Sequence, residues 1–179
     1  MRASILAPLL LMAMAMASAC TSSPPPDTRP LGNVTASPQE CGLIAKRVII
    51  RATGVEMYEA SGSERGGPFS YCVVTDPQHD DRGSLLSIQL DNPSALSAEE
   101  LANTKKHDHG VDLPPGLGPG YTANFDGKNS RNTYAYAWTS DASRLLSVWI
   151  TPGASGRDHR ADAIEFIRQL RPVLLATAK

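Results

Sequence analysis

Apolar residues first gather in an unbroken run near the start of the chain, and only later recur at helical or strand spacing. The run covers about residues 5–16, follows the single basic residue Arg2, and precedes small residues that end at Ala19. A bilayer core needs about 20 apolar residues, so this run is too short for a membrane-spanning helix. The layout predicts a cleavable signal peptide over residues 1–19.

Three later segments carry apolar residues at the spacing of one helix face. A capping box that begins at Ser37 predicts a helix over residues 38–51, with Cys41 among its core-facing positions. A second capping box predicts a short helix over about 97–106. The last helix is expected over 159–171, where Pro172 would end or kink it.

Strand patterns fill the segments between these helices. Residues 69–75 are rich in aromatic and β-branched side chains, and residues 86–90 alternate between apolar and polar, which predicts a hairpin. Residues 121–125, 133–139 and 145–151 are separated by short polar turns, as in an antiparallel meander. The order helix, two strands, helix, three strands, helix predicts an α+β fold with an antiparallel sheet of about five strands and helices at both ends of the chain.

The segment before the first predicted helix has a different composition. Residues 20–37 are rich in Pro, Ser and Thr and predict a disordered tether, which leaves 38–179 as a single globular domain. Loss of residues 1–19 removes one basic residue, so 17 basic and 18 acidic residues become 16 and 18, a net charge of about −2. This balance argues against nucleic acid as a partner and against polybasic attraction to anionic lipid.

Cys20 directly follows the predicted signal peptide. The stretch Ala17-Ser18-Ala19-Cys20 resembles the bacterial lipobox, in which the cysteine receives acyl chains such as palmitate and becomes the first mature residue. Stable anchoring takes more than one acyl chain, and it would place the protein on the extracytoplasmic face of the cell membrane. A lipobox usually has Leu where this chain has Ala17, so the alternative is ordinary cleavage that leaves Cys20 as a free thiol.

The two remaining cysteines form an even pair. Exported proteins meet an oxidising compartment, so Cys41 and Cys72 are predicted to form a disulfide. The alternative is a pair of zinc ligands, but the chain lacks the Cys-x-x-Cys spacing or the nearby histidines that zinc sites use.

Several of these features occur together in one known family. They are the lipobox Cys20 with its Pro-rich tether, Cys41 in a helix that closes at Gly54, Cys72 in the next strand, and a Gly-Leu-Gly connector at 116–118. In this layout the mature chain resembles actinobacterial cell-envelope lipoproteins of unknown function. The resemblance implies an α/β sandwich with a bridged cysteine pair, and it implies no catalytic residue or ligand.

The aromatic residues suggest a binding surface. Tyr134, Tyr136 and Trp138 alternate along one predicted strand, and Trp149 lies on the next. Alternate residues of a strand share one face, and the aliphatic residues that alternate with Trp149 already fill the buried face. All four aromatic residues are therefore predicted to share the other face of the sheet, at least partly reachable from solvent. They would then suit cell-wall sugars, lipids or a partner protein. The alternative is that these rings are core.

Chemistry at histidine is the remaining possibility. His107-Asp108-His109 follows a predicted helix end, where histidine is favourable without a metal, and His79-Asp80-Asp81 fits a turn. The chain has no Gly-x-Ser-x-Gly elbow and no His-Glu-x-x-His motif. We therefore expect a non-enzymatic binding or interaction module of the cell envelope, without metal or cofactor. The alternative is an envelope hydrolase acting on wall or lipid substrates, with His107 or His109 as the base.

Overall fold

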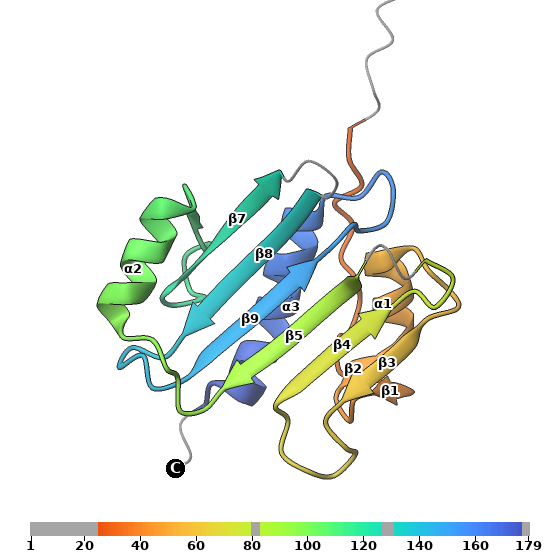
Figure 1. Ribbon diagram of the computed structural model, residues 1–179, viewed down its shortest axis with the longest axis horizontal. Helices are drawn as coiled ribbons and strands as arrows, with labels where there is room; N and C mark the ends of the chain where they lie inside the picture. The colour runs from red at the N-terminus through yellow and green to blue at the C-terminus, as the bar shows by residue number, and fades with distance from the viewer. Residues whose placement is uncertain (1–24, 80–82, 127–130, 177–179) are drawn as a thin grey trace, which may run out of the picture.

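The computed structural model describes residues 25–79, 83–126 and 131–176, and a large antiparallel sheet dominates this part of the chain (Figure 1). The sheet strands are β3 (Glu59–Gly62), β4 (Tyr71–Thr75), β5 (Ser84–Asp91), β6 (Val111–Asp112), β7 (Gly120–Asp126), β8 (Arg131–Trp138) and β9 (Leu145–Ile150). Among the described residues they form one seven-stranded sheet in the order β3-β4-β5-β9-β8-β7-β6. The predicted α+β class is confirmed, and the sheet gains the short edge strands β3 and β6 beyond the five predicted.

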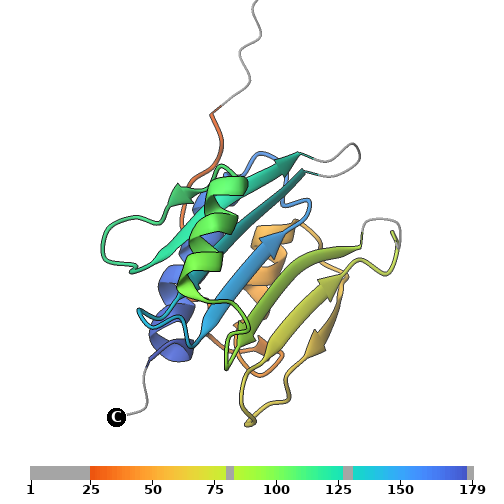
Figure 2. The same cartoon turned by 60° about the vertical axis from the view of Figure 1, so that its left-hand side comes forward.

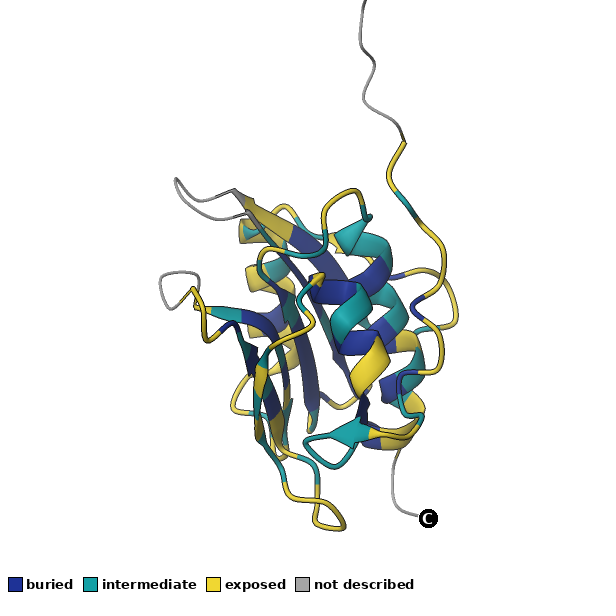
Figure 3. Ribbon diagram, turned by 90° about the vertical axis from the view of Figure 1, so that its right-hand side faces the viewer, coloured by how far each residue is buried: buried dark blue, intermediate teal, exposed yellow. Residues whose placement is uncertain are grey.

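Helices cover the two faces of the sheet unequally. On one face lie α1 (Lys46–Thr53) and α3 (His159–Leu174), which bury a continuous apolar core against β4, β5, β8 and β9. Figure 3 shows the buried residues concentrated on the strands and on the helices that face them. On the other face, α2 (Ala98–His107) lies over β7 and β8 and leaves β3, β4 and β5 uncovered by any described helix (Figure 2).

The first predicted helix is much shorter than expected. Residues 38–45 form a hairpin of β1 (Gln39–Glu40) and β2 (Ile44–Ala45), and α1 begins only at Lys46. At the hairpin turn Cys41 and Gly42 have φ angles of 49° and 72°, which a right-handed helix excludes. A Cβ at Gly42 would lie 2.9 Å from the carbonyl oxygen of Glu64, so glycine fits this close approach.

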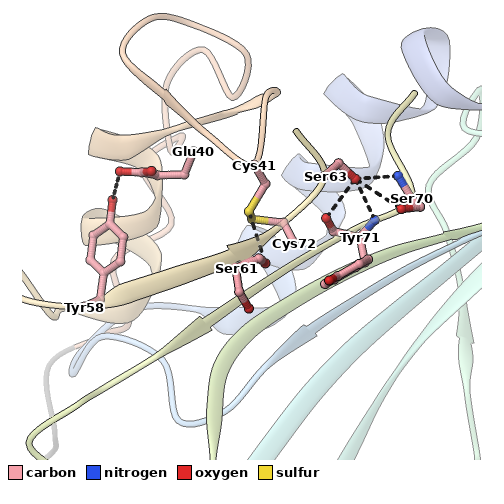
Figure 4. Close-up of a disulfide and its surroundings, with 8 residues drawn as sticks. All are labelled: Glu40, Cys41, Tyr58, Ser61, Ser63, Ser70, Tyr71 and Cys72. Atoms are coloured by element: carbon pink, nitrogen blue, oxygen red, sulfur yellow. Dashed lines mark hydrogen bonds between the residues drawn. A yellow bond between two sulfur atoms is a disulfide. The ribbon is translucent and has the colours of Figure 1, made fainter. Parts of the chain in front are cut away.

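The predicted disulfide is confirmed. It joins Cys41 in the hairpin turn to Cys72 in β4, with a Cα–Cα distance of 5.5 Å (Figure 4). Gly62 on β3 makes room for the bridge, because a Cβ there would lie 2.3 Å from the carbonyl oxygen of Tyr71 and 3.0 Å from Sγ of Cys41. The bridge therefore fastens the β1–β2 hairpin to the sheet.

The described part of the predicted tether is folded onto the domain. Residues 20–37 were expected to be disordered, yet Leu31 and Val34 are buried in the core between the helices and the sheet. The amide of Val34 donates to Oε1 of Gln169 in α3 at 2.8 Å, and Nε2 of Gln169 donates to the carbonyl of Gly32 at 2.8 Å. The folded domain thus begins near Asp27. Cys20, the predicted lipidation site, and the signal peptide lie outside the described residues.

The other two helices agree more closely with the sequence. Both capping-box hydrogen bonds are present between Ser97 and Glu100 at the start of α2. In α3 the helix continues through Pro172, which was expected to end or kink it, and ends at Leu174. Within the described residues, none of the helices combines the length and apolar content that a bilayer-spanning helix requires.

Candidate functional site

The aromatic residues gather on the sheet face that α2 partly covers. Pairing between β8 and β9 sets Tyr134 opposite Trp149, and their rings stack with centroids 4.6 Å apart and planes 20° apart. Tyr136 and Trp138 alternate with the small Ala135 and Ala137, which face the opposite core. The four residues selected from the sequence therefore lie on one face.

Tyr121 of β7 is the most deeply buried ring of this cluster, and sequence reasoning missed it. It pairs with Tyr136 across the strands, with ring centroids 5.2 Å apart, and its ring also lies 6.2 Å from that of Trp138. Its place follows from the register between β7 and β8, for which the sequence alone gave no signal beyond alternation.

The helix α2 divides the cluster into a buried part and a partly exposed part. Leu101 of α2 belongs to the same buried cluster as Tyr121, Tyr134 and Trp138, and Trp138 keeps only 8% of its surface exposed. These three rings form a small second core, which differs from the expected solvent-reachable stripe. Tyr136 and Trp149 remain half-buried, because they lie where the cover of α2 ends.

Asp108, just after α2, connects the helix to the rings. Its carboxylate accepts a hydrogen bond from the Tyr121 hydroxyl at 2.9 Å and one from the Tyr134 hydroxyl, and Nδ1 of His107 lies 3.2 Å away. Burial alone would raise the pKa of Asp108, but these hydrogen bonds outweigh it and the pKa is lowered. Burial together with the Asp108 carboxylate raises the pKa of Tyr121 and of Tyr134. Both hydroxyls therefore stay neutral and act as donors that hold α2 in place.

A polar pocket continues the face beyond the two half-buried rings. Strand pairing sets Ser87 beside Trp149, and Gln89 beside Ser147, which in turn pairs with Tyr136. The pocket has a volume of about 330 Å³ and is lined by Ser70, Tyr71, Val73, Ser87, Gln89, Leu90 and Asp91. Nε2 of Gln89 donates to Oδ1 of Asp91 at 2.6 Å. We call Tyr136, Trp149 and this lining the border strip.

The border strip offers no strong base or nucleophile. Burial raises the pKa of Tyr136 to about 12, against a smaller opposite effect of the hydrogen bond from Trp149. Amide, hydroxyl and carboxylate groups beside two half-buried rings can instead bind a ligand that combines apolar and hydrogen-bonding surfaces.

The histidines lie away from this strip. His107 and His109 are exposed, and among the described residues no hydrogen bond joins either of them to a serine. His79 contacts Asp76 through Nδ1 at 2.8 Å, while Asp80 and Asp81 lie outside the described residues. In the part of the chain that is described, no three His, Cys, Asp or Glu side chains are grouped to hold a metal ion.

The two indoles are expected to differ in their accessibility to acrylamide. Trp149 is half-buried and Trp138 is almost fully buried, so a quencher in solvent should reach only the first. In the single-tryptophan variant Trp138→Phe, the remaining fluorescence should be quenched efficiently, whereas Trp149→Phe should leave a shielded emission. Equal quenching constants in the two variants would contradict this placement of α2.

Comparison of the chain with protein-family models, with curated proteins and with solved structures found no match. The resemblance to actinobacterial envelope lipoproteins therefore stays a prediction from the residues that suggested it.

Proposed function

We propose that this protein is a lipid-anchored binding module on the extracytoplasmic side of the cell membrane, and that it binds cell-wall glycan at the border strip. The observation that carries this proposal is the exposed edge of the aromatic cluster: Tyr136 and Trp149 stay half-buried beside an uncovered polar half of the sheet. If the cluster served only stability, covering both rings would stabilise the fold further, because stabilisation increases with the aromatic area that is buried.

The chemistry of the strip favours a sugar over an acyl chain. An indole or phenol face packs against the C–H face of a sugar ring, while nearby amides, hydroxyls and carboxylates pair with its hydroxyl groups. Ser87 supplies such a group next to Trp149, and Gln89 and Asp91 supply others farther along the same face of β5. An acyl chain would displace water from the Ser87 hydroxyl and from the polar atoms of Gln89 and Asp91 that do not bond each other, which costs free energy.

The same contacts support binding without catalysis. Asp108, the carboxylate closest to the rings, is occupied by two tyrosine hydroxyls, and the pKa of each tyrosine is raised. Neither His107 nor His109 reaches a nucleophile among the described residues. The cluster therefore positions α2 and the border strip rather than moving protons.

Replacing Trp149 tests this function. Trp149→Ala should weaken binding of soluble peptidoglycan or arabinogalactan fragments at least about tenfold, because central aromatic contacts usually contribute more than 1.4 kcal/mol. Isothermal titration calorimetry suits the measurement, since it does not depend on the indole that is removed. The matched control is Phe125→Ala, an exposed aromatic on β7 outside the strip, which should bind like the unaltered protein.

Two results would count against the proposal. Equal affinities for Trp149→Ala and Phe125→Ala would move the binding site elsewhere. No measurable heat with either kind of wall fragment would remove glycan as the ligand class.

A further inference from the structure

The beginning of the described chain is clamped to one place on the domain. The amide of Asp27 donates to the carbonyl of Gly156 at 2.7 Å, and the amide of Asp158 donates to the carbonyl of Asp27 at 3.1 Å. Arg157 reinforces this pairing, because its guanidinium donates to Asp27 Oδ2 at 3.2 Å and to the Arg29 carbonyl at 2.8 Å. Together with the buried Leu31, these contacts fix where the tether leaves the domain.

The clamp leaves only a short connection to the predicted lipid site. Six residues, 21–26, separate Cys20 from Asp27. Seven fully extended steps span at most about 25 Å. A folded domain of this size is about 40 Å across, estimated from its expected radius of gyration. The connection is thus shorter than the domain is wide.

Strand register identifies the end of the sheet at which the connection leaves. β9 ends at Ile150, just before the 151–158 loop that holds Asp27, and Ile150 pairs with Thr133 near the start of β8. The same end carries the start of β3, the end of β4 and the end of β7, as the pairings across the sheet require. Figure 1 shows the chain leaving from this end, which we call the tether end.

Two exposed apolar side chains belong to the tether end. Phe125 lies near the last residue of β7 and Met57 lies in the connection between α1 and β3. At the opposite end, the start of β4 carries Tyr71, also exposed. Tyr71 lies about 14 Å of strand away from Thr75, the tether-end residue of β4, so a short connection at the tether end keeps Tyr71 farther from the anchor than Phe125 and Met57.

We propose that the domain lies on the membrane surface with its tether end toward the lipid headgroups, so that Phe125 and Met57 contact the bilayer interface. This orientation rests on the proposed lipid anchor at Cys20. Amphipathic contact of a few apolar side chains adds to acyl anchoring at an interface. The strands then run away from the membrane, and the border strip opens sideways, with Trp149 at the end near the bilayer and Tyr71 at the far end.

Photo-crosslinking of the full chain in its native membrane tests the orientation. Phe125→p-benzoylphenylalanine and Tyr71→p-benzoylphenylalanine form a matched pair, since both replace exposed aromatic residues, of which 58% and 45% of the surface is accessible. After irradiation, phospholipid adducts detected by mass spectrometry should form at position 125, and position 71 should stay at the level of the unirradiated sample. A 30-residue Gly/Ser insertion between Pro25 and Pro26 should reduce this difference, because it lengthens the connection beyond the domain.

Each outcome decides one point. Protein that remains with the membrane but forms lipid adducts equally at both positions, or mainly at 71, overturns the orientation and leaves the anchor intact. Protein recovered in the soluble fraction, without adducts at either position, overturns both the orientation and the anchor on which it rests. A preference for position 125 that the insertion does not change would overturn the short connection as its cause.

Discussion

Removal of the Cys41–Cys72 bridge is expected to lower the free energy of unfolding by roughly 3 to 4 kcal/mol. The bridge closes a loop with a sequence separation of 31 residues, and the loss follows from the larger conformational freedom of the open unfolded chain. For a domain of ordinary stability this is a large fraction of the total. Urea unfolding of the oxidised protein and of the Cys41→Ala/Cys72→Ala variant measures the difference.

The reductant provides the control for this prediction. Dithiothreitol should shift the unfolding midpoint of the unaltered protein toward that of the double variant, and it should leave the double variant unchanged. An unaltered midpoint in protein whose two thiols have become alkylatable would show that the bridge contributes nothing. The slope of the transition should rise when the bridge is absent, because a chain without the cross-link exposes more surface on unfolding.

Local pattern predicted the elements that local interactions decide. The capping box at Ser97 is satisfied by two hydrogen bonds within four residues, so its sequence was enough to start α2. Alternation along β5 and β8 assigned each residue to a face, because the period of a strand is two. The pairing of Cys41 with Cys72 was predicted from the oxidising compartment that an exported protein meets and from the even number of cysteines left besides Cys20.

The hairpin at residues 38–45 is stabilised by contacts from outside the segment. The segment from Ser37 carries a capping box, yet Glu40 accepts a hydrogen bond from Tyr58 at 3.2 Å, far along the chain (Figure 4). The disulfide and the carbonyl of Glu64 beside Gly42 also act from outside the segment. Tertiary contacts thus replaced a helix that local preference allowed.

The edge strand β6 was missed for a different reason. It has only two residues, which is too few to show an alternation of apolar and polar positions.

The candidate site was predictable in its face but not in its exposure. The register of β8 against β9 brought Tyr134, Tyr136, Trp138 and Trp149 together as alternation required. Which rings stay accessible depends on where α2 docks, and that is decided by Leu101 and by the hydrogen bonds from Tyr121 and Tyr134 to Asp108. These contacts join residues from separate strands and a helix, so no window of sequence contains them.

The same limit applies to the tether. Composition marked residues 20–37 as Pro-, Ser- and Thr-rich, and an average over that window conceals two apolar residues three positions apart. Leu31 and Val34 enter the core because α3 offers Gln169 to satisfy the backbone on either side of Asn33. Backbone partners of this kind are what an extended segment needs to be buried.

Arg157→Met is expected to lower the free energy of unfolding by about 3 to 5 kcal/mol, because it leaves a buried carboxylate without its partner. Arg157 and Asp162 keep only 6% and 2% of their side-chain surfaces exposed. Nε of Arg157 donates to Asp162 Oδ2 at 2.8 Å, and its Nη2 contacts the other carboxylate oxygen. The substitution also removes the contacts of Arg157 with Asp27 and with the Arg29 carbonyl, so the loss combines an unpaired charge with a weaker clamp on the chain. Urea unfolding at neutral pH measures it.

Two further variants separate these contributions. Arg29→Met makes the same change at an exposed cation that pairs with Asp27, and it should shift the unfolding midpoint far less, because solvent screens that pair. Arg157→Met/Asp162→Leu removes both buried charges and should recover a large part of the loss. Recovery stays incomplete for two reasons: Asp162 is favourable in the first turn of α3, and the contacts of Arg157 with Asp27 and with the Arg29 carbonyl stay lost. A double variant as unstable as Arg157→Met would mean that release of the clamped chain, and not the buried charge, accounts for the effect.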